Sequence, residues 1–254
     1  MRLKDKVALI TGAGRGIGKG IAQVFSKEGA KVAVLDIKED EGKETADACG
    51  RAEKRAIFIK ADLKNSAEIQ DAIKTVIDEF SKLDILVNNA GYHISKNVLN
   101  TSEEEWEFIQ NTNLRSTFLC SKYALPHLIK TKGNIINISS MVGLVGQPNA
   151  CAYAATKGGQ IAMSKGMAID MAPYGVRVNV ICPGWVQTPL VDDWFGQQED
   201  EQAARKYIFG QHPLGRIATV EEIGKAAVFL ASNEEAGFIT GITLNIEGGI
   251  TLGY

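Results

Sequence analysis

The chain has 254 residues, of which 45% are apolar and 23% are charged, and 28 basic against 30 acidic side chains give a formal net charge of −2. This composition is typical of a globular protein and excludes collagen-like, coiled-coil and disordered chains. The near-zero charge argues against a nucleic-acid partner, and no apolar run approaches the ~18 residues that cross a membrane.

The four cysteines, Cys49, Cys120, Cys151 and Cys182, show no Cys-x-x-Cys spacing. Free thiols in a reducing compartment are therefore expected, rather than disulfides or a metal cluster. The apolar run near the N-terminus is too short for a signal peptide. These features together predict a cytoplasmic protein without a membrane partner.

Short apolar runs alternate with helical patterns along the whole chain. Segments of strand length occur at 7–10, 32–35, 56–59, 85–87, 134–138, 176–181 and 242–246. Helical patterns occupy the stretches 16–29, 39–49, 69–80, 103–131, 151–172 and 219–231. Seven buried strands separated by helices predict a doubly wound α/β fold with a parallel sheet covered on both faces, in one domain that spans residues 1–254.

The segment 183–218 has no regular pattern, and it is aromatic, rich in glutamine and interrupted by prolines. It follows the sixth predicted strand, and in open α/β sheets ligands bind beyond the carboxyl ends of the strands. We therefore expect residues 185–215 to form a substrate lid within the single domain.

A glycine-rich loop lies where the first predicted strand turns into the first helix, at Thr11-Gly12-Ala13-Gly14-Arg15-Gly16-Ile17-Gly18. Glycines allow a tight turn and a close approach of the backbone to a pyrophosphate, and the amino end of a helix attracts anions. The same residues could form a plain turn. The strand before them and the helix after them favour a dinucleotide site.

Asp36 ends the second predicted strand, about 20 residues beyond the glycines, as expected for a ribose-binding carboxylate. Such a carboxylate accepts hydrogen bonds from an adenosine 2′-hydroxyl and repels a 2′-phosphate, which favours NAD over NADP. Arg15 argues in the other direction, because an arginine in this loop can pair with a 2′-phosphate. The alternative is that Asp36 only caps the next helix.

Tyr153 and Lys157 lie four residues apart on a predicted helix and therefore share one face. A tyrosine that titrates near 10 is a poor base at neutral pH, and a nearby ammonium should lower its pKa. An ordinary exposed pair is the alternative. The helix follows the fifth strand, which ends at Ser139-Ser140, and this location favours a catalytic pair.

Several motifs occur together in the order and spacing of the short-chain dehydrogenase/reductase family, and the chain resembles this family over essentially its whole length. The motifs are Thr11-Gly12-x-x-x-Gly16-x-Gly18, Asn88-Asn89-Ala90-Gly91, Asn113, Ser140, Tyr153-x-x-x-Lys157 and Pro183-Gly184. The resemblance implies a Rossmann-type sheet with the strand order 3-2-1-4-5-6-7. Within the family, the sequence is similar to sugar and 17β-hydroxysteroid dehydrogenases and to 3-oxoacyl-carrier-protein reductases.

The resemblance implies four catalytic residues. Tyr153 would exchange a proton with the carbinol oxygen, and Lys157 would lower the pKa of Tyr153 and hold the nicotinamide ribose. Ser140 would hydrogen-bond the substrate oxygen. Asn113 would position a water in a proton relay through Lys157, and the alternative for Asn113 is a role in a helix kink.

The resemblance also implies a cofactor site and a substrate site. Asp62 would bind the adenine amino group, unless it only caps the following helix. His93 and Trp185 would line the substrate pocket, and the alternatives are an exposed loop histidine and a tryptophan that packs the lid. The cofactor residues would be Gly12, Arg15, Gly16, Ile17, Gly18, Asp36, Asp62, Leu63, Asn89, Ala90, Gly91, Tyr153, Lys157, Pro183, Gly184, Val186 and Thr188, and the substrate residues His93, Ser140, Gln147, Tyr153 and Trp185.

The implied reaction is hydride transfer between a secondary alcohol or ketone, such as a sugar or polyol, and NAD, without a metal. A 3-oxoacyl-carrier-protein reductase, a hydroxysteroid dehydrogenase and a catalytically silent NAD-binding regulator are the alternatives. Asp36 and the acidic lid argue against the reductase. The family is usually tetrameric, and we expect a homotetramer with the tail 252–254 at a subunit interface.

Overall fold

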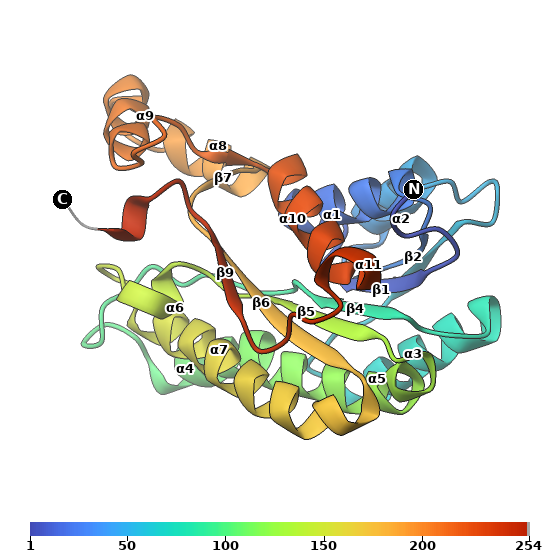
Figure 1. Cartoon of the computed structure of the whole chain (residues 1–254). Coiled ribbons are helices and arrows are strands. Elements are labelled where there is room, and N and C mark those ends of the chain that lie inside the picture. The colour runs from blue at the N-terminus through green and yellow to red at the C-terminus, as the bar shows by residue number, and fades with distance from the viewer. Residues whose placement is uncertain (253–254) are drawn as a thin grey trace.

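Seven parallel strands form the central sheet of the computed structural model, which describes residues 1–252 (Figure 1). Their order across the sheet is β3-β2-β1-β4-β5-β6-β9, which confirms the predicted order because β9 is the seventh strand of this sheet. The strands are β1 (Val7–Thr11), β2 (Lys31–Asp36), β3 (Ala56–Lys60), β4 (Ile85–Asn88), β5 (Asn134–Ile138), β6 (Arg177–Pro183) and β9 (Thr243–Ile246).

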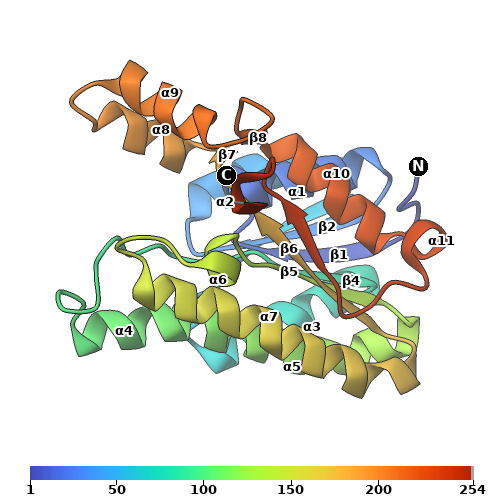
Figure 2. The same cartoon turned by 60° about the vertical axis from the view of Figure 1, so that its left-hand side comes forward.

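Helices cover both faces of the sheet, as the two views in Figures 1 and 2 show. One layer contains α1 (Gly16–Lys27), α2 (Glu39–Ala48), α10 (Val220–Ala231) and the short α11 (Asn233–Ala236). The other contains α3 (Ser66–Phe80), α4 (Glu103–Ile109), α5 (Ser116–Thr131) and α7 (Cys151–Met171). Short helical turns occur at α6 (Val142–Val145), η2 (Ala172–Tyr174) and η3 (Ile250–Leu252).

The alternation of side chains along β1 explains why both faces need a helical layer. Ala8 and Ile10 belong to the apolar cluster under α1 and α10, whereas Val7 and Leu9 belong to the cluster under α3 and α5. All five residues of β1 are buried. A strand that is apolar on both faces is stable only inside a sheet covered on both sides.

The long helix predicted over 103–131 is interrupted in its middle. Between α4 and α5 the chain forms one stretch of π-helix, η1 (Gln110–Arg115), which contains Asn113. The predicted helix at 151–172 agrees with α7 to within one residue. Among residues 1–252, no helix is long and apolar enough to cross a membrane.

The prediction of an irregular segment at 183–218 is wrong, because this segment contains two helices, α8 (Pro189–Gly196) and α9 (Glu201–Gly210). Thr188 caps α8 by accepting a hydrogen bond from Val191 N, and Asp200 caps α9 by accepting one from Ala203 N. Two short strands, β7 (Val186–Gln187) and β8 (Ala218–Thr219), pair at the base of the segment. The helices are too short to show a clear apolar period.

The two helices have an apolar core of their own. Phe195, Ile208 and Ile217 form it, separately from the clusters that cover the sheet. Both views show α8 and α9 projecting from the body of the protein (Figures 1 and 2). The predicted interface role of the tail 252–254 concerns mainly Tyr254, which lies outside the described residues, whereas Leu252 is exposed.

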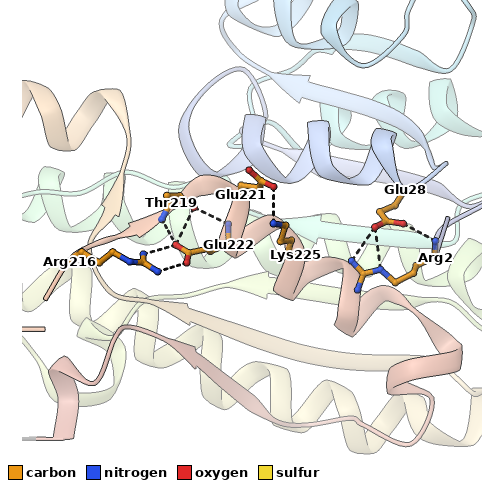
Figure 3. A network of polar contacts seen from close by, with 7 residues as sticks. All are labelled: Arg2, Glu28, Arg216, Thr219, Glu221, Glu222 and Lys225. Carbon is orange, nitrogen blue, oxygen red and sulfur yellow. Dashed lines mark hydrogen bonds and ion pairs between the residues drawn. The ribbon is translucent and has the colours of Figure 1, made fainter. Parts of the chain in front are cut away.

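A polar network fixes the chain where it leaves this segment (Figure 3). Both carboxylate oxygens of Glu222 accept hydrogen bonds from Arg216, at 2.9 and 2.6 Å, and one of them also accepts from Thr219 N at 2.8 Å. The Thr219 hydroxyl accepts in return from Glu222 N, which completes a capping box at the amino end of α10. These contacts, above all the hydrogen bonds from Arg216, lower the pKa of Glu222 to about 2.

Glu222→Ala should lower the free energy of unfolding by about 1 kcal/mol at neutral pH, a typical value for a helix cap. Because the pKa of Glu222 is lowered by folding, its carboxylate stabilises the fold fully above the ordinary value of 4.5 and loses this effect as the pH falls toward about 2. Urea unfolding of both proteins at neutral and at strongly acidic pH would measure the difference.

Glu221→Ala is the matched control, because it removes only the exposed pair between Glu221 and Lys225, one turn apart on α10. Its effect should stay within about 0.5 kcal/mol. A Glu222→Ala effect of equal size at both pH values would contradict a role of the charge.

Candidate active site

The glycine-rich loop between β1 and α1 lies in direct contact with residues 89–91. Gly12 has a positive φ of 61°, and a Cβ atom at this position would lie 2.8 Å from Ala90 Cα. The Asn89 side chain donates hydrogen bonds to Thr11 O at 3.0 Å and Gly12 O at 2.9 Å. Only glycine permits this approach, and Asn89 fixes it.

The amino end of α1 fits an anion. Gly16 has a positive φ of 56°, and a Cβ at Gly18 would lie 2.2 Å from Gly12 O. Arg15 is the N-cap residue but provides no capping side chain. The first-turn N–H groups, including that of Ile17, therefore have no side-chain cap from Arg15 and could donate hydrogen bonds to an anion.

Asp36 binds the glycine-rich loop rather than capping α2. Its carboxylate accepts hydrogen bonds from Gly14 N at 2.8 Å and Lys38 N at 3.0 Å, and Lys38 is itself the N-cap of α2. The Arg15 guanidinium lies 3.8 Å from a carboxylate oxygen of Glu41. Glu41 is not among the predicted site residues, and its only signal in the sequence is its place among three acidic residues in the first turn of α2.

Asp62 and Leu63 follow β3, as expected, and Asp62 does not cap the next helix. Asp62 accepts a hydrogen bond from Lys64 N at 2.9 Å, and the N-cap of α3 is Asn65. Leu63 is partly buried and packs against the apolar cluster under α3 and α5. Neither residue makes a described hydrogen bond to the glycine-rich loop.

Ser140, Tyr153 and Lys157 come together where β5 ends. Lys157 is 3% exposed, and its Nζ donates hydrogen bonds to Ile138 O at 2.9 Å and to Gln160 Oε1 at 3.2 Å. The same nitrogen lies 5.6 Å from the ring centre of Tyr153. The Ser140 hydroxyl accepts from Val142 N at 3.2 Å and lies close enough to Tyr153 to influence its titration.

Burial dominates the titration of this group in the absence of a ligand. It raises the pKa of Tyr153 to about 12, with the Ser140 hydroxyl acting in the opposite direction, and it lowers the pKa of Lys157 to about 8. The expected lowering of the Tyr153 pKa is therefore wrong for the protein alone. Burial of the phenol, which disfavours the phenolate, is the largest cause.

Asn113 is fully buried and holds the chain beside Gly91. Its side-chain oxygen accepts from Tyr92 N at 2.7 Å, and its amide nitrogen donates to Tyr92 O at 2.9 Å and to Thr156 Oγ1 at 3.1 Å. A Cβ at Gly91 would lie 3.5 Å from Lys157 Nζ and 3.4 Å from Asn113 Oδ1, so all three residues meet here.

The motifs predict a water between Asn113 and Lys157, but an unpredicted side chain connects them. The Gln160 amide accepts from Lys157 Nζ and donates to Asn113 O at 3.0 Å. In the sequence, Gln160 is the polar residue one turn after Lys157 on a face that is otherwise buried, and that was the available signal.

The predicted substrate residues lie in different surroundings. The His93 ring packs edge-on against the Tyr153 ring, with centres 4.7 Å apart, and desolvation lowers the pKa of His93. Trp185 packs against Trp194 at 5.1 Å, which agrees with the alternative of lid packing. Gln147 is exposed between α6 and α7, and no described contact brings it to Tyr153.

The four remaining predicted cofactor residues follow β6 and lead toward α8. Pro183 O accepts from Met141 N at 2.9 Å, and Gly184 N donates to Ile246 O at 3.0 Å, so this stretch is tied to its neighbours. Val186 is buried. A Cβ at Gly16 would lie 3.5 Å from Thr188 Cγ2, which places the start of α8 against the glycine-rich loop.

Comparisons with known proteins agree with this geometry. Residues 12–251 match a family model described as "Enoyl-(Acyl carrier protein) reductase". The L-fucose dehydrogenase of Bos taurus is 41% identical over 254 residues, which cover 100% of this chain and 92% of that protein. The meso-2,3-butanediol dehydrogenase of Serratia marcescens is 37% identical over 253 residues, which cover 99% and 96%.

A solved structure has the same fold. The crystal structure of the Cj0485 dehydrogenase superposes with a TM-score of 0.93 at 33% identity, and the match covers 98% of this chain and 95% of that one. The resemblance predicted from the motifs is therefore confirmed. The chain belongs to the short-chain dehydrogenase/reductase family, and it is an oxidoreductase that acts on CH–OH groups.

Proposed function

We propose that the protein is an NAD-dependent dehydrogenase of a sugar or polyol. The observation that carries the catalytic part is the meeting of Ser140, Tyr153 and Lys157 beside the glycine-rich loop. Two curated relatives, named for L-fucose and for butanediol, support a polar alcohol as the substrate.

The residues around the glycine-rich loop fit a nicotinamide dinucleotide. A Cβ at Gly12 or Gly18 would clash with the packed loop and disturb its conformation, and the uncapped amino end of α1 offers free N–H groups to a pyrophosphate. Asn89, Ala90 and Gly91 would bound the adenosine side, with Asp62 and Leu63 farther along the sheet edge, and Pro183, Gly184, Val186 and Thr188 would bound the nicotinamide side. When bound, the oxidised cofactor supplies the hydride acceptor.

The chain's own residues move and orient the proton. The Ser140 hydroxyl would bind the carbinol oxygen. Oxidation would require the phenolate form of Tyr153, which takes the proton from that oxygen, whereas reduction would use the phenol form, which donates it. Lys157 uses two of its three N–H donors inside the protein, which leaves one for a ribose hydroxyl. Because the pKa of Tyr153 is raised to about 12, the phenol holds its proton at neutral pH and is ready to donate it to a ketone.

Tyr153→Phe should reduce kcat by roughly 10²- to 10⁴-fold, the usual contribution of a general acid or base, while cofactor affinity changes little. Steady-state kinetics and a fluorescence titration with NADH would measure the two quantities. The control is Tyr174→Phe, which changes an exposed tyrosine after α7. Activity of Tyr153→Phe near the wild-type level would remove Tyr153 from the proposed role.

The preference for NAD is supported by two carboxylates. Asp36 holds the backbone of the glycine-rich loop, and Glu41 lies beside the Arg15 guanidinium. Arg15 is therefore partly neutralised before any phosphate arrives, and a 2′-phosphate would meet both negative charges. Arg15 therefore attracts the 2′-phosphate of NADP less strongly than an unpaired arginine would.

The double variant Asp36→Asn with Glu41→Gln should lower the NAD/NADP ratio of kcat/KM by roughly tenfold or more, equivalent to ~1.4 kcal/mol. Asparagine keeps an oxygen that can accept from Gly14 N, so the loop should survive. Glu44→Gln, which changes an exposed partner of Lys19 on the same helix, is the control. An unchanged ratio in the double variant would contradict the assignment.

A panel of aldoses, polyols, hydroxysteroids and 3-oxoacyl thioesters, each with NAD(H) and NADP(H), would identify the substrate class. We expect the highest kcat/KM with a sugar or polyol and NAD, because the imidazole of His93 lies against the Tyr153 ring and can hydrogen-bond a hydroxyl. A hydroxysteroid or thioester as the only active compound would exclude this assignment.

We also propose that residues 185–215 act as a substrate lid. Thr188 at the start of α8 lies against Gly16 of the glycine-rich loop, and the two lid helices have a separate apolar core. Arg205 lies between Asp192 and Glu201, which partly neutralises the acidic lid surface.

We also propose that the protein is a homotetramer in the cytoplasm. Phe118 on α5 and Ile169 on α7 are exposed apolar side chains, and we propose that these two helices pair between subunits. Gly159 on α7 packs within the subunit, because a Cβ there would lie 2.9 Å from Leu114 Cδ2. Four free cysteines support a reducing compartment.

A further inference from the structure

The side chain of Gln160 is fully buried one turn after Lys157 on α7. Its oxygen accepts from Lys157 Nζ at 3.2 Å, and its nitrogen donates to Asn113 O at 3.0 Å and Thr117 Oγ1 at 2.8 Å. The partners determine how the amide is oriented, because an ammonium only donates and a carbonyl only accepts. Gln160 therefore joins the ammonium on α7 to the π-helical turn η1.

A buried amide is costly unless its hydrogen bonds are made, and an apolar side chain of similar volume would fill the same space without that risk. The Asn113 carbonyl also accepts from the Thr117 hydroxyl at 2.7 Å, so it does not depend on Gln160 alone. Neither packing nor the need of the Asn113 carbonyl for a donor therefore explains why residue 160 is an amide. Of its three hydrogen bonds, only the one to Lys157 involves a charged group.

The charge of Lys157 has little other support. The titratable groups that face it are the Tyr153 phenol on α7 and the Cys182 thiol on β6, and burial raises the pKa of both, so both are neutral near neutral pH. In the described part of the chain no carboxylate pairs with Lys157. Its ammonium is held by two neutral oxygens, those of Ile138 and Gln160.

We propose that Gln160 is a positioning residue that keeps Lys157 charged and fixes its Nζ relative to the turn that carries Asn113. This inference depends on the proposed function only in that the proposed function gives Lys157 a catalytic role. The contact itself makes a prediction about the ligand-free protein, and that prediction needs no substrate and no cofactor.

The test is the titration of the Lys157 ammonium in ligand-free protein labelled with ¹⁵N-lysine, with the signal assigned by its loss in Lys157→Met. The wild-type midpoint is expected at about 8. Gln160→Met keeps the volume and removes the oxygen, and it should lower the midpoint by about one pH unit, because a hydrogen bond to a charged group of this kind is worth roughly that much. Gln160→Glu places a carboxylate beside the ammonium and should raise the midpoint instead.

Activity provides a second readout. The alkaline decline of kcat should move in the same direction as the Lys157 midpoint in each Gln160 variant. If the midpoint moves but Tyr153→Phe stays active, the inference about Gln160 holds and the proposed function fails. If Tyr153→Phe is inactive and neither Gln160 variant moves the midpoint, the proposed function holds and the positioning role fails.

Ser164→Ala is the structural control. Ser164 is buried one turn farther along α7 and accepts from Asn137 Nδ2 at 2.7 Å, without a described contact to Lys157. It should lower the melting temperature and leave the Lys157 midpoint unchanged. If Gln160→Met does not fold, the sign of the shift in Gln160→Glu decides, and an unchanged or lowered midpoint there overturns the proposal.

Discussion

The burial of one ammonium group without a carboxylate partner is the constraint around which this site is arranged. Lys157 is 3% exposed, and its charge is balanced by the ends of neutral dipoles, the Ile138 carbonyl at the end of β5 and the Gln160 amide. A Cβ at Gly143 would lie 2.6 Å from the Lys157 carbonyl carbon, so the turn after β5 also packs closely on this residue. A carboxylate would hold the charge more firmly but would cancel the positive charge that lies beside the Tyr153 ring, and neutral oxygens leave that charge in place.

The charged groups near the glycine-rich loop are arranged differently from the buried Lys157. Here full charges lie near the surface, where Arg15 and Glu41 are 3.8 Å apart and both side chains remain partly exposed. Surface ion pairs are weak because water screens them, so this pair contributes little to folding. The local charge that it sets is the basis of the NAD preference proposed above. The buried end of the site thus relies on neutral oxygens, whereas the exposed end carries full charges.

The features that the sequence predicts correctly are those carried by local patterns. Seven apolar runs predict the strands, and the order of the sheet follows from the family motifs. The closeness of Tyr153 and Lys157 is predicted because helical spacing places them on one face. The features that it misses depend on contacts between distant residues. Gln160 resembles any polar residue on a helix until α7 packs against η1, and the caps of α8 and α9 stabilise helices too short for a periodic signal.

The segment 185–215 contacts the glycine-rich loop through one of its residues. Thr188 caps α8 through Val191 N, and its methyl group faces Gly16 at the amino end of α1. At its other end, the lid is held to α10 by Arg216 and Glu222 (Figure 3). The amino end of α10 is in turn packed on α1, where a Cβ at Gly20 would lie 2.6 Å from Val220 Cβ. Both ends of this segment are therefore packed against α1, one directly and the other through α10.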